Sequence, residues 1–267
     1  MLLCTSCSLW VDTGRQQCSK DSDCTGRGAA FANSTCVESL CTLPTKWSCL
    51  GSVTWPSAGT GTVTATLNLK DIITNDAIPG VSGRLCRKLD VACATPLVSG
   101  LLSDAQGKLV VDAPAGFDGY VELQSTNAIP GMYFFYPPLA ASREIPFVPI
   151  LPLAELTAFA QVIGSDLVPD RGQILAGAYD CFRNPAEGVT FSSLDADEWS
   201  TPFYMIKEMP SITATATDSS GYGGILNFPP GSVGFSGQLA TGAVIGTESL
   251  LVRANQITYT ALPPMPQ

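Results

Sequence analysis

The stretch SDAQGKLVVDAPAGFDGYVEL, residues 103–123, recurs in altered form as TDSSGYGGILNFPPGSVGFSG, residues 217–237. Each copy has a D-x-x-G motif, then a run rich in apolar residues, then a proline and a glycine before a second run. Asp bonds to its own backbone in turns, Gly adopts positive φ, and Pro presets the turn that follows. We therefore predict that each copy forms a turn, a strand, a second turn and another strand.

The matching positions keep their spacing in the two copies. Asp104 and Gly107 are separated by the same number of residues as Asp218 and Gly221. The proline and glycine of the second turn follow at corresponding positions, which are Pro114 with Gly116 and Pro229 with Gly231. Two copies predict two β-sandwich domains of roughly 90–100 residues each.

Short strand patterns separated by turn residues fill most of the chain beyond residue 60. In VTATLNLKDII, residues 63–73, apolar and polar residues alternate, which predicts a strand with one buried face. The turn signals recur about every 8–12 residues, which is typical of a β-sandwich. The predicted fold class is all-β, with two antiparallel sandwiches. Further strands are expected in KLVVDAP, GYVELQS, MYFFYPP, QILAGAYDC, GVTFSSL, SITATATD, GGILNFPP, GSVGFSG, ESLLVRA and QITYTAL.

One segment has a helical pattern instead. In LPLAELTAFAQVIGSDL, which starts at Leu151, apolar residues recur at helical spacing until Gly164 stops the pattern. We expect one short helix packed across the junction of the sandwiches, in preference to a helix that binds a partner. The predicted division is a disulfide-rich module, a first sandwich, a linking helix and a second sandwich, at residues 1–58, 59–150, 151–167 and 168–267.

Seven of the ten cysteines lie in the first 49 residues, among turn-forming residues that offer little apolar surface. Disulfides supply stability that such a segment cannot gain by burial, and they indicate an oxidising compartment. The pairing is not readable, because six cysteines allow 15 connectivities. Two roles stay open for Cys181, which are a buried thiol and a disulfide link to the N-terminal module. The disulfide candidates are Cys7, Cys18, Cys24, Cys36, Cys41, Cys49 and the pair Cys86 with Cys93, which closes a short loop.

Metal binding and free thiols are the alternatives for these cysteines. Zinc modules pair their ligands as C-x2-4-C, and Cys4 with Cys7 is the one C-x2-C in the chain. A second close pair at a fitting distance is missing, apart from the looser pair Cys36 and Cys41, so no metal or cofactor is predicted. Leu2 and Leu3 before Cys4 are similar to the end of a lipoprotein signal, without its small residues. Cys4 is therefore a lipidation candidate, and an ordinary apolar N-terminus is the alternative.

The turn motifs resemble those of carboxypeptidase regulatory-like domains, which have a transthyretin-like β-sandwich. The match in the second half runs through Gly177–Asp180, Pro185–Val189, Thr217–Tyr222 and Pro230–Gly231, and that in the first half through Pro79–Val81, Ser103–Gly107 and Pro114–Gly116. The opening cysteine stretch is similar to a short disulfide module at the front of bacterial envelope proteins. The resemblance implies a mostly non-catalytic accessory domain, used for spacing, folding support or binding.

Composition narrows the function further. The chain has 14 basic and 23 acidic residues, a net charge of −9, which disfavours nucleic acid and anionic lipid. It has no histidine, which excludes Ser-His-Asp and Cys-His triads, His-ligated zinc and the iron site of the related intradiol dioxygenases. It has no run of 18 apolar residues, so no membrane-spanning helix is predicted.

Two surface candidates remain. Asp195, Asp197 and Glu198 cluster beside Trp199, an arrangement that glycosidases use but that ordinary acidic loops also show. In the aromatic run MYFFYPP, residues 132–138, alternation places Tyr133 and Phe135 on one face. That face would contact a partner or a glycan if exposed, and the alternative is packing between the domains or under the helix.

From these observations we expect a non-enzymatic structural or binding protein of the cell envelope, secreted or held by a lipid anchor. Its partners would be other envelope proteins or glycans. One rival interpretation is a subunit of a larger surface assembly. The other is a carbohydrate-binding protein or a carboxylate-dependent hydrolase, which would need a pocket with paired carboxylates.

Overall fold

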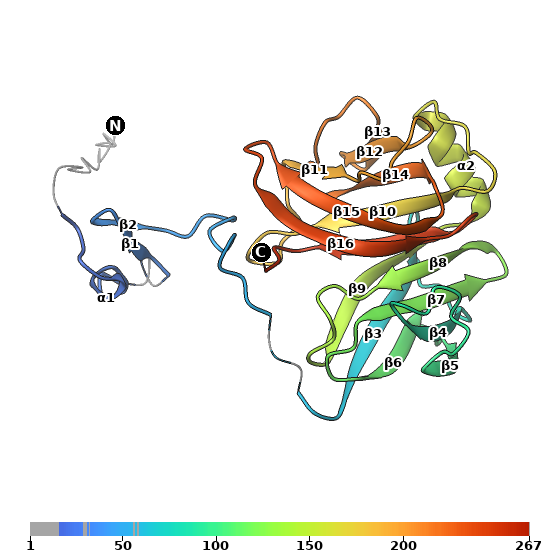
Figure 1. Cartoon of the computed structure of the whole chain (residues 1–267), viewed down its shortest axis with the longest axis horizontal. Coiled ribbons are helices and arrows are strands. Elements are labelled where there is room, and N and C mark those ends of the chain that lie inside the picture. Colours follow the sequence, from blue (N-terminus) through green and yellow to red (C-terminus); the bar gives the residue numbers. More distant parts are fainter. Residues whose placement is uncertain (1–15, 29–30, 32, 56, 58, 267) are drawn as a thin grey trace, which may run out of the picture. The chain divides into compact units, whose positions relative to one another are not determined.

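The computed structural model describes residues 16–28, 31, 33–55, 57 and 59–266. The chain divides into two compact units, Met1–Ser48 and Cys49–Gln267, drawn in Figure 1. Cys4 and Cys7 lie outside the described residues. None of the helices in the described part of the chain is long and apolar enough to cross a bilayer.

The small unit is built around two disulfides. One short helix and a two-stranded hairpin are joined by Cys18–Cys36 and Cys24–Cys41, and the sulfur-bearing residues Cys18 and Cys24 are buried. The Asp23 carboxylate accepts the backbone N–H of Ser19 at 2.8 Å and so fixes the start of the helix. Covalent links therefore replace the apolar core that this segment lacks. Its elements are α1 (Asp21–Thr25), β1 (Thr35–Val37) and β2 (Leu40–Thr42).

The large unit contains two successive groups of strands, which we name the first and second repeat, and the all-β prediction is confirmed. The first repeat consists of β3 (Thr62–Asp71), β4 (Ser82–Arg87), β5 (Val98–Leu102), β6 (Lys108–Pro114), β7 (Gly119–Ser125), β8 (Ala128–Phe134) and β9 (Arg143–Ile150). The second consists of β10 (Gly172–Ala178), β11 (Val189–Ser192), β12 (Thr201–Ile206), β13 (Met209–Ser211), β14 (Tyr222–Phe228), β15 (Gly231–Leu239), β16 (Val244–Val252) and β17 (Ile257–Leu262).

The two repeats share one pattern of strand pairing. In the first, β3 pairs antiparallel with β6 and parallel with β9. In the second, β10 pairs antiparallel with β14 and parallel with β17. The facing sheets correspond as well, because β4, β7 and β8 are joined in the same order as β11, β15 and β16. These pairings make β14 the counterpart of β6, and β17 the counterpart of β9.

The D-x-x-G turns explain why the pattern recurs. Gly107 donates its N–H to the carbonyl of Asp104 at 3.0 Å, and Gly221 donates to that of Asp218 at 2.9 Å. Both glycines have a φ of +72°, and a Cβ on Gly107 would lie 2.5 Å from the Leu69 carbonyl oxygen. Only glycine fits such a position without strain, so the motif read from the sequence sets the same strand entry twice.

The repeats are fused through one nine-stranded sheet, whose order is β13-β12-β14-β10-β17-β8-β7-β4-β5. The fusion occurs where β17 pairs in parallel with β8, with Ile257, Thr258 and Tyr259 opposite Gly131, Met132 and Tyr133. Two three-stranded sheets, β6-β3-β9 and β11-β15-β16, complete the sandwiches. In Figure 1 the second repeat is yellow to red and the first is cyan to green.

The predicted helix is confirmed as α2 (Leu153–Val162), followed by Gly164 at a φ of +68°. Its buried residues, Leu156 and Ala160, join a hydrophobic core that contains side chains of both repeats. The Phe159 ring meets the Phe203 ring edge to face at 4.9 Å between centroids. Helix α2 therefore packs into the shared core.

Some strand predictions were wrong. SITATATD, residues 211–218, was expected to be a strand, but β13 ends at Ser211 and the next strand begins at Tyr222. The segment instead fixes the start of β11, because the Thr217 hydroxyl donates to the Ala186 carbonyl at 2.7 Å and accepts the Val189 N–H at 3.0 Å. The prediction also missed β4, β5, β9 and β12, where apolar and polar residues alternate weakly.

Candidate functional site

The acidic loop beside Trp199 is held by internal contacts. Asp197 binds the Arg171 guanidinium with two hydrogen bonds of 2.9 and 2.7 Å and also accepts the Trp199 N–H. The Arg171 hydrogen bonds lower the pKa of Asp197 to about 2. Such a carboxylate stays ionised near neutral pH and has no proton to donate as a general acid. Asp195 accepts the N–H of Gly234 in β15 at 2.9 Å.

The rest of this loop faces solvent. Glu198 is exposed, 55% of Trp199 is accessible, and Leu194 is fully exposed. The structure thus brings Asp195, Asp197, Glu198 and Trp199 together on one loop, as the sequence indicates. It gives two of the three carboxylates a positioning role in the fold.

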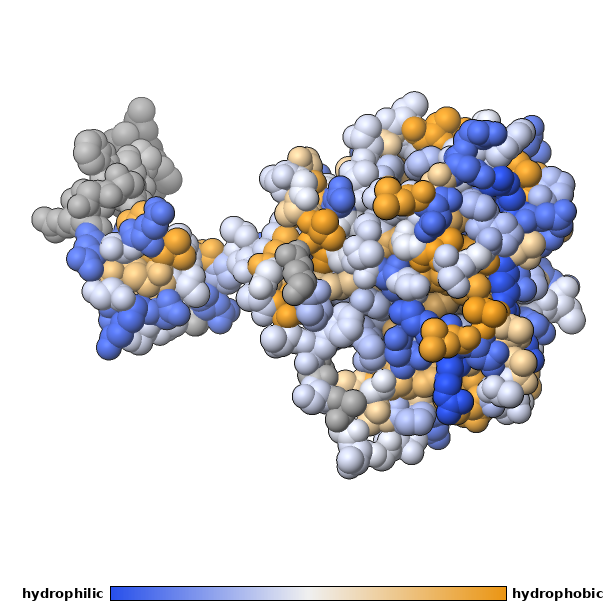
Figure 2. Space-filling view, viewed as in Figure 1, coloured by the Kyte–Doolittle hydropathy of each residue, from blue (hydrophilic) through white to orange (hydrophobic). Residues whose placement is uncertain are grey.

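The aromatic run lies inside the molecule. Tyr133, Phe134 and Phe135 are 8%, 1% and 0% exposed, so both faces of the run are covered. Tyr133 packs against Phe135 in the shared core, and Phe134 stacks on Tyr120 at 5.1 Å between centroids. These positions match packing between the repeats. On the face shown in Figure 2, hydrophobic residues form separate patches between hydrophilic ones.

The eight described cysteines form four disulfides. Besides the two in the small unit, Cys86 pairs with Cys93 and Cys49 pairs with Cys181. The second of these links the start of the large unit to the loop after β10, so Cys181 is bonded to Cys49. A sulfur bonded to sulfur is no longer a thiolate ligand, which leaves these eight residues unsuited to zinc.

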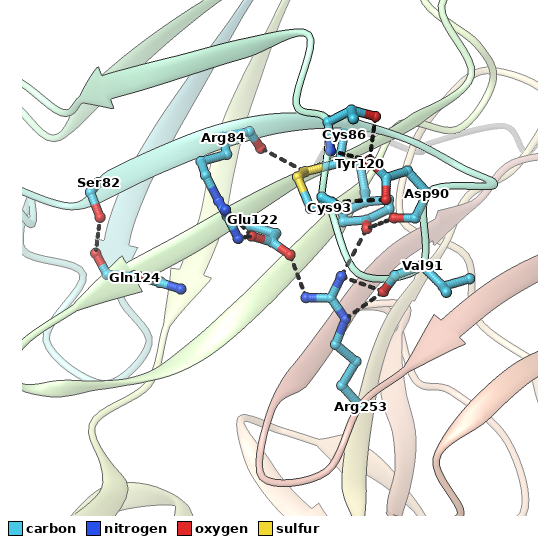
Figure 3. Close-up of polar contacts among 12 residues, drawn as sticks. Ser82, Arg84, Cys86, Asp90, Val91, Cys93, Tyr120, Glu122, Gln124 and Arg253 are labelled. Atoms are coloured by element: carbon cyan, nitrogen blue, oxygen red, sulfur yellow. Dashed lines mark hydrogen bonds and ion pairs between the residues drawn. A yellow bond between two sulfur atoms is a disulfide. The ribbon is translucent and has the colours of Figure 1, made fainter.

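A network of hydrogen bonds and ion pairs lies where the two repeats meet (Figure 3). Glu122, from β7, is only 4% exposed and sits between two guanidinium groups. Arg84, from the adjacent strand β4, donates Nε–H to Glu122 at 2.9 Å and forms a second hydrogen bond from Nη2. Arg253, from the turn between β16 and β17, donates Nη1–H to the other carboxylate oxygen. We name these three residues the arginine clamp.

A small disulfide loop completes the binding of Arg253. The Cys86–Cys93 bond closes residues 86–93, and the Val91 carbonyl accepts hydrogen bonds from Arg253 Nε and Nη2 at 3.1 and 2.7 Å. Arg253 Nη2 also donates to the Tyr120 hydroxyl at 2.8 Å, which in turn donates to the Asp90 carbonyl at 2.6 Å. One side chain of the second repeat therefore makes four hydrogen bonds to three groups of the first.

A second buried carboxyl lies inside the sandwich of the second repeat. Glu248, on β16, is 2% exposed and accepts a hydrogen bond from the Thr260 hydroxyl of β17. Its other oxygen has no hydrogen-bond partner among the described residues. Burial raises the pKa of Glu248 to about 8, while the Thr260 hydrogen bond and Lys88 act in the opposite direction and Asp118 adds to the rise. The carboxyl is therefore mostly protonated at pH 7.

This burial predicts a pH-dependent stability. Because the pKa is raised on folding from its ordinary 4.5, the folded state holds the proton that the unfolded state releases. The stability contributed by Glu248 is complete below about pH 4.5 and is lost as the pH rises to about 8. Thermal melts of Glu248→Gln should show a flatter fall in Tm across that window than the wild type. Parallel curves for the two proteins would contradict the assignment.

Two surface hollows lie near the disulfide loop, with volumes of about 280 and 580 Å³. Both include Lys88, Leu89 and Asp118, and the Lys88 ammonium lies 3.5 Å from the Asp118 carboxylate. Asp118 is the one carboxylate that lines either hollow. Neither hollow therefore offers the two carboxyl groups that glycoside hydrolysis needs.

Sequence reasoning did not identify Glu122, Arg253 or Tyr120. One signal was present, because Glu122 stands between Val121 and Leu123 in the middle of a strand. A charged residue that is buried needs a partner, but the partner Arg253 lies 131 residues further along the chain.

The sequence matches none of the protein-family models, and no curated protein is similar to it at a significant level. Solved structures with low similarity include the Bacillus anthracis TIE protein, a streptococcal ancillary pilin and BcpA, the major pilin subunit of Bacillus cereus. Their identities are 9%, 13% and 9%, and the alignments cover 76%, 77% and 77% of this chain, with TM-scores of 0.28, 0.26 and 0.27. The chain spans 34%, 63% and 100% of their respective lengths.

Proposed function

We propose that the protein is a non-enzymatic structural component of a cell envelope, in which the two repeats act as one rigid spacer. The observation that carries this proposal is the joint between the repeats. Its parallel strand pairing, shared core and arginine clamp all resist independent motion of the two sandwiches. A binding site on either repeat would be held at a fixed distance from the other.

An extracytoplasmic location follows from the same proposal. Four disulfides persist in an oxidising compartment and are rare in the cytosol. The turn motifs support membership of the carboxypeptidase regulatory-like domains, which serve mostly as accessories. The proposal also includes lipidation of Cys4. It keeps the division of the chain into an N-terminal module, a first sandwich, a linking helix and a second sandwich, with boundaries after residues 58, 150 and 167.

A role in a larger surface assembly is the second candidate, and the unpaired strand edges favour it. The nine-stranded sheet ends in β5 and β13, and the sheet β6-β3-β9 ends in β6 and β9. Such edges offer free backbone groups to another strand. Trp199 and the surrounding acidic loop remain a candidate contact for a glycan or protein partner.

Calorimetry and cell fractionation together test the rigid-spacer proposal. We expect one cooperative unfolding transition for the large unit, because neither repeat keeps its sheet intact alone. The protein from its host should be found outside the cytoplasm, with a mass lower than its reduced form by two hydrogens per disulfide. Two independent transitions would contradict the spacer, and a cytoplasmic protein with free thiols would contradict the location.

A further inference from the structure

The outer edge of β6 is open, whereas the same edge in the second repeat is covered. Its counterpart β14 lies between β10 and β12, and the hairpin of β12 and β13 extends the sheet beyond it. Strand β6 pairs with β3 and has no second strand partner among the described residues. The first repeat therefore ends in a seven-residue edge, KLVVDAP, where the second has a further hairpin.

The hydrogen bonds at the two ends of β6 show which of its backbone groups point outward. The Gly107 carbonyl accepts the Leu69 N–H, and the Ala115 N–H donates to the Gly61 carbonyl, so both residues face β3. Bonded residues alternate along an antiparallel strand. Hence Leu109, Val111 and Ala113 also bond toward β3, and Lys108, Val110 and Asp112 direct their N–H and C=O groups outward.

Two of these three outward residues have unused backbone groups. Lys108 is bonded within its own turn, because its N–H donates to the Asp104 carboxylate at 2.8 Å and its carbonyl accepts the Asp104 N–H at 3.0 Å. No hydrogen bond in the described part of the structure uses the backbone N–H or C=O of Val110 or Asp112. Val110 is 52% exposed. The edge thus offers two donors and two acceptors, side by side.

We propose that this edge pairs with β6 of a second copy of the chain, antiparallel and symmetric about Val111. Val110 then lies opposite Asp112 of the second copy, and the two N–H and two C=O groups of each edge form four hydrogen bonds. The two sheets β6-β3-β9 become one continuous six-stranded sheet. Because this contact is isologous, it makes a closed dimer.

The charges on the edge favour a second copy as the occupant. Lys108 and Asp112 both lie on the exposed face of β6. In the symmetric pairing, Lys108 of each copy lies diagonally across from Asp112 of the other, within reach of a long side chain. Each pairing brings two such contacts of opposite charge against one diagonal contact of like charge between the two Asp112 residues, so the opposite charges are in excess across the edge.

This inference rests on the assembly role among the proposed functions and names one contact for it. The test is sedimentation of the full-length chain over a range of concentrations. We expect the wild type to dimerise. K108E or D112K alone should weaken the dimer at least tenfold, because each substitution places like charges opposite each other across the dimer interface. An equimolar mixture of K108E and D112K should form a mixed dimer, since one edge carries two carboxylates and the other two ammonium groups.

Two further variants separate the edge from general effects. Lys207→Glu makes the same charge change in the exposed turn after β12 and should leave the dimer intact. Val110→Pro removes an outward N–H that β3 does not use, so the fold should persist while the dimer is lost. A monomeric wild type, or equal effects of K108E and Lys207→Glu, would overturn the pairing. Either result leaves the rigid spacer standing, because calorimetry tests that proposal separately.

Discussion

Replacing Glu122 with alanine should lower the free energy of unfolding by about 3–5 kcal/mol, because it leaves two guanidinium groups at a buried site without their carboxylate. Arg253 should account for most of this loss. Its side chain is 20% exposed, whereas that of Arg84 is 42% exposed and more of its charge is screened by water. Urea unfolding of the purified full-length chain measures this change in the free energy of unfolding directly.

Glu198→Ala is the matched control, because it removes the same side chain from an exposed loop. We expect it to change the unfolding free energy by less than about 0.5 kcal/mol. A double-mutant cycle of Glu122→Ala with Arg253→Met should show strong coupling, since the two residues share one ion pair. Equal, small effects of the two glutamate variants would show that the clamp adds nothing to the joint.

Removal of the Cys49–Cys181 disulfide should lower the free energy of unfolding by about 2–5 kcal/mol. The bond joins residues 132 positions apart, so it restricts the unfolded chain far more than a short loop does. The variant Cys49→Ser with Cys181→Ser should therefore unfold at lower denaturant concentration while its circular dichroism stays that of a β protein. Denaturant titration of the oxidised protein gives the value.

The Cys86–Cys93 bond is the internal comparison, because it spans only seven positions. Loop closure alone predicts a cost of about 2 kcal/mol for its removal, well below that of the long bond. The two residues are also buried, so serine adds a packing cost. A larger loss of unfolding free energy on removing the Cys86–Cys93 bond would contradict this order. It would show that the role of this bond in fixing Val91 for Arg253 outweighs chain entropy.

The parts of the fold that depend on local chemistry could be predicted. The D-x-x-G turns at Gly107 and Gly221 and the helix that ends before Gly164 follow from backbone preferences within a few residues. The joint could not be predicted, because nothing near Ile257 marks Gly131 as its partner. The segment SITATATD shows the opposite error. Alternation favoured a strand there, but the Thr217 hydroxyl bonds to Ala186 and to Val189 at the start of β11, so the segment is a connection between strands.

The candidate site divides in the same way. The cluster at Asp195, Asp197 and Trp199 is visible in the sequence, but its role depends on Arg171, which lies 26 residues away from Asp197. Glu122 is recognisable as a charged residue within a strand, yet only the folded chain brings Arg253 to it. A cluster of charged residues in the sequence therefore marks a candidate site. Whether it serves catalysis or holds the fold together depends on the residues that pair with it in the folded chain.

The parallel pairing of β17 with β8 also has a consequence for the order of folding. Strand β8 belongs to the first repeat, but its neighbour is β17 of the second, so its edge stays open until β17 has been synthesised. An early-folding first repeat would carry an exposed strand edge throughout synthesis, which is a known route to aggregation. The pairing that joins the two repeats can therefore form only after β17 has been made, and until then the β8 edge depends on whatever else covers it.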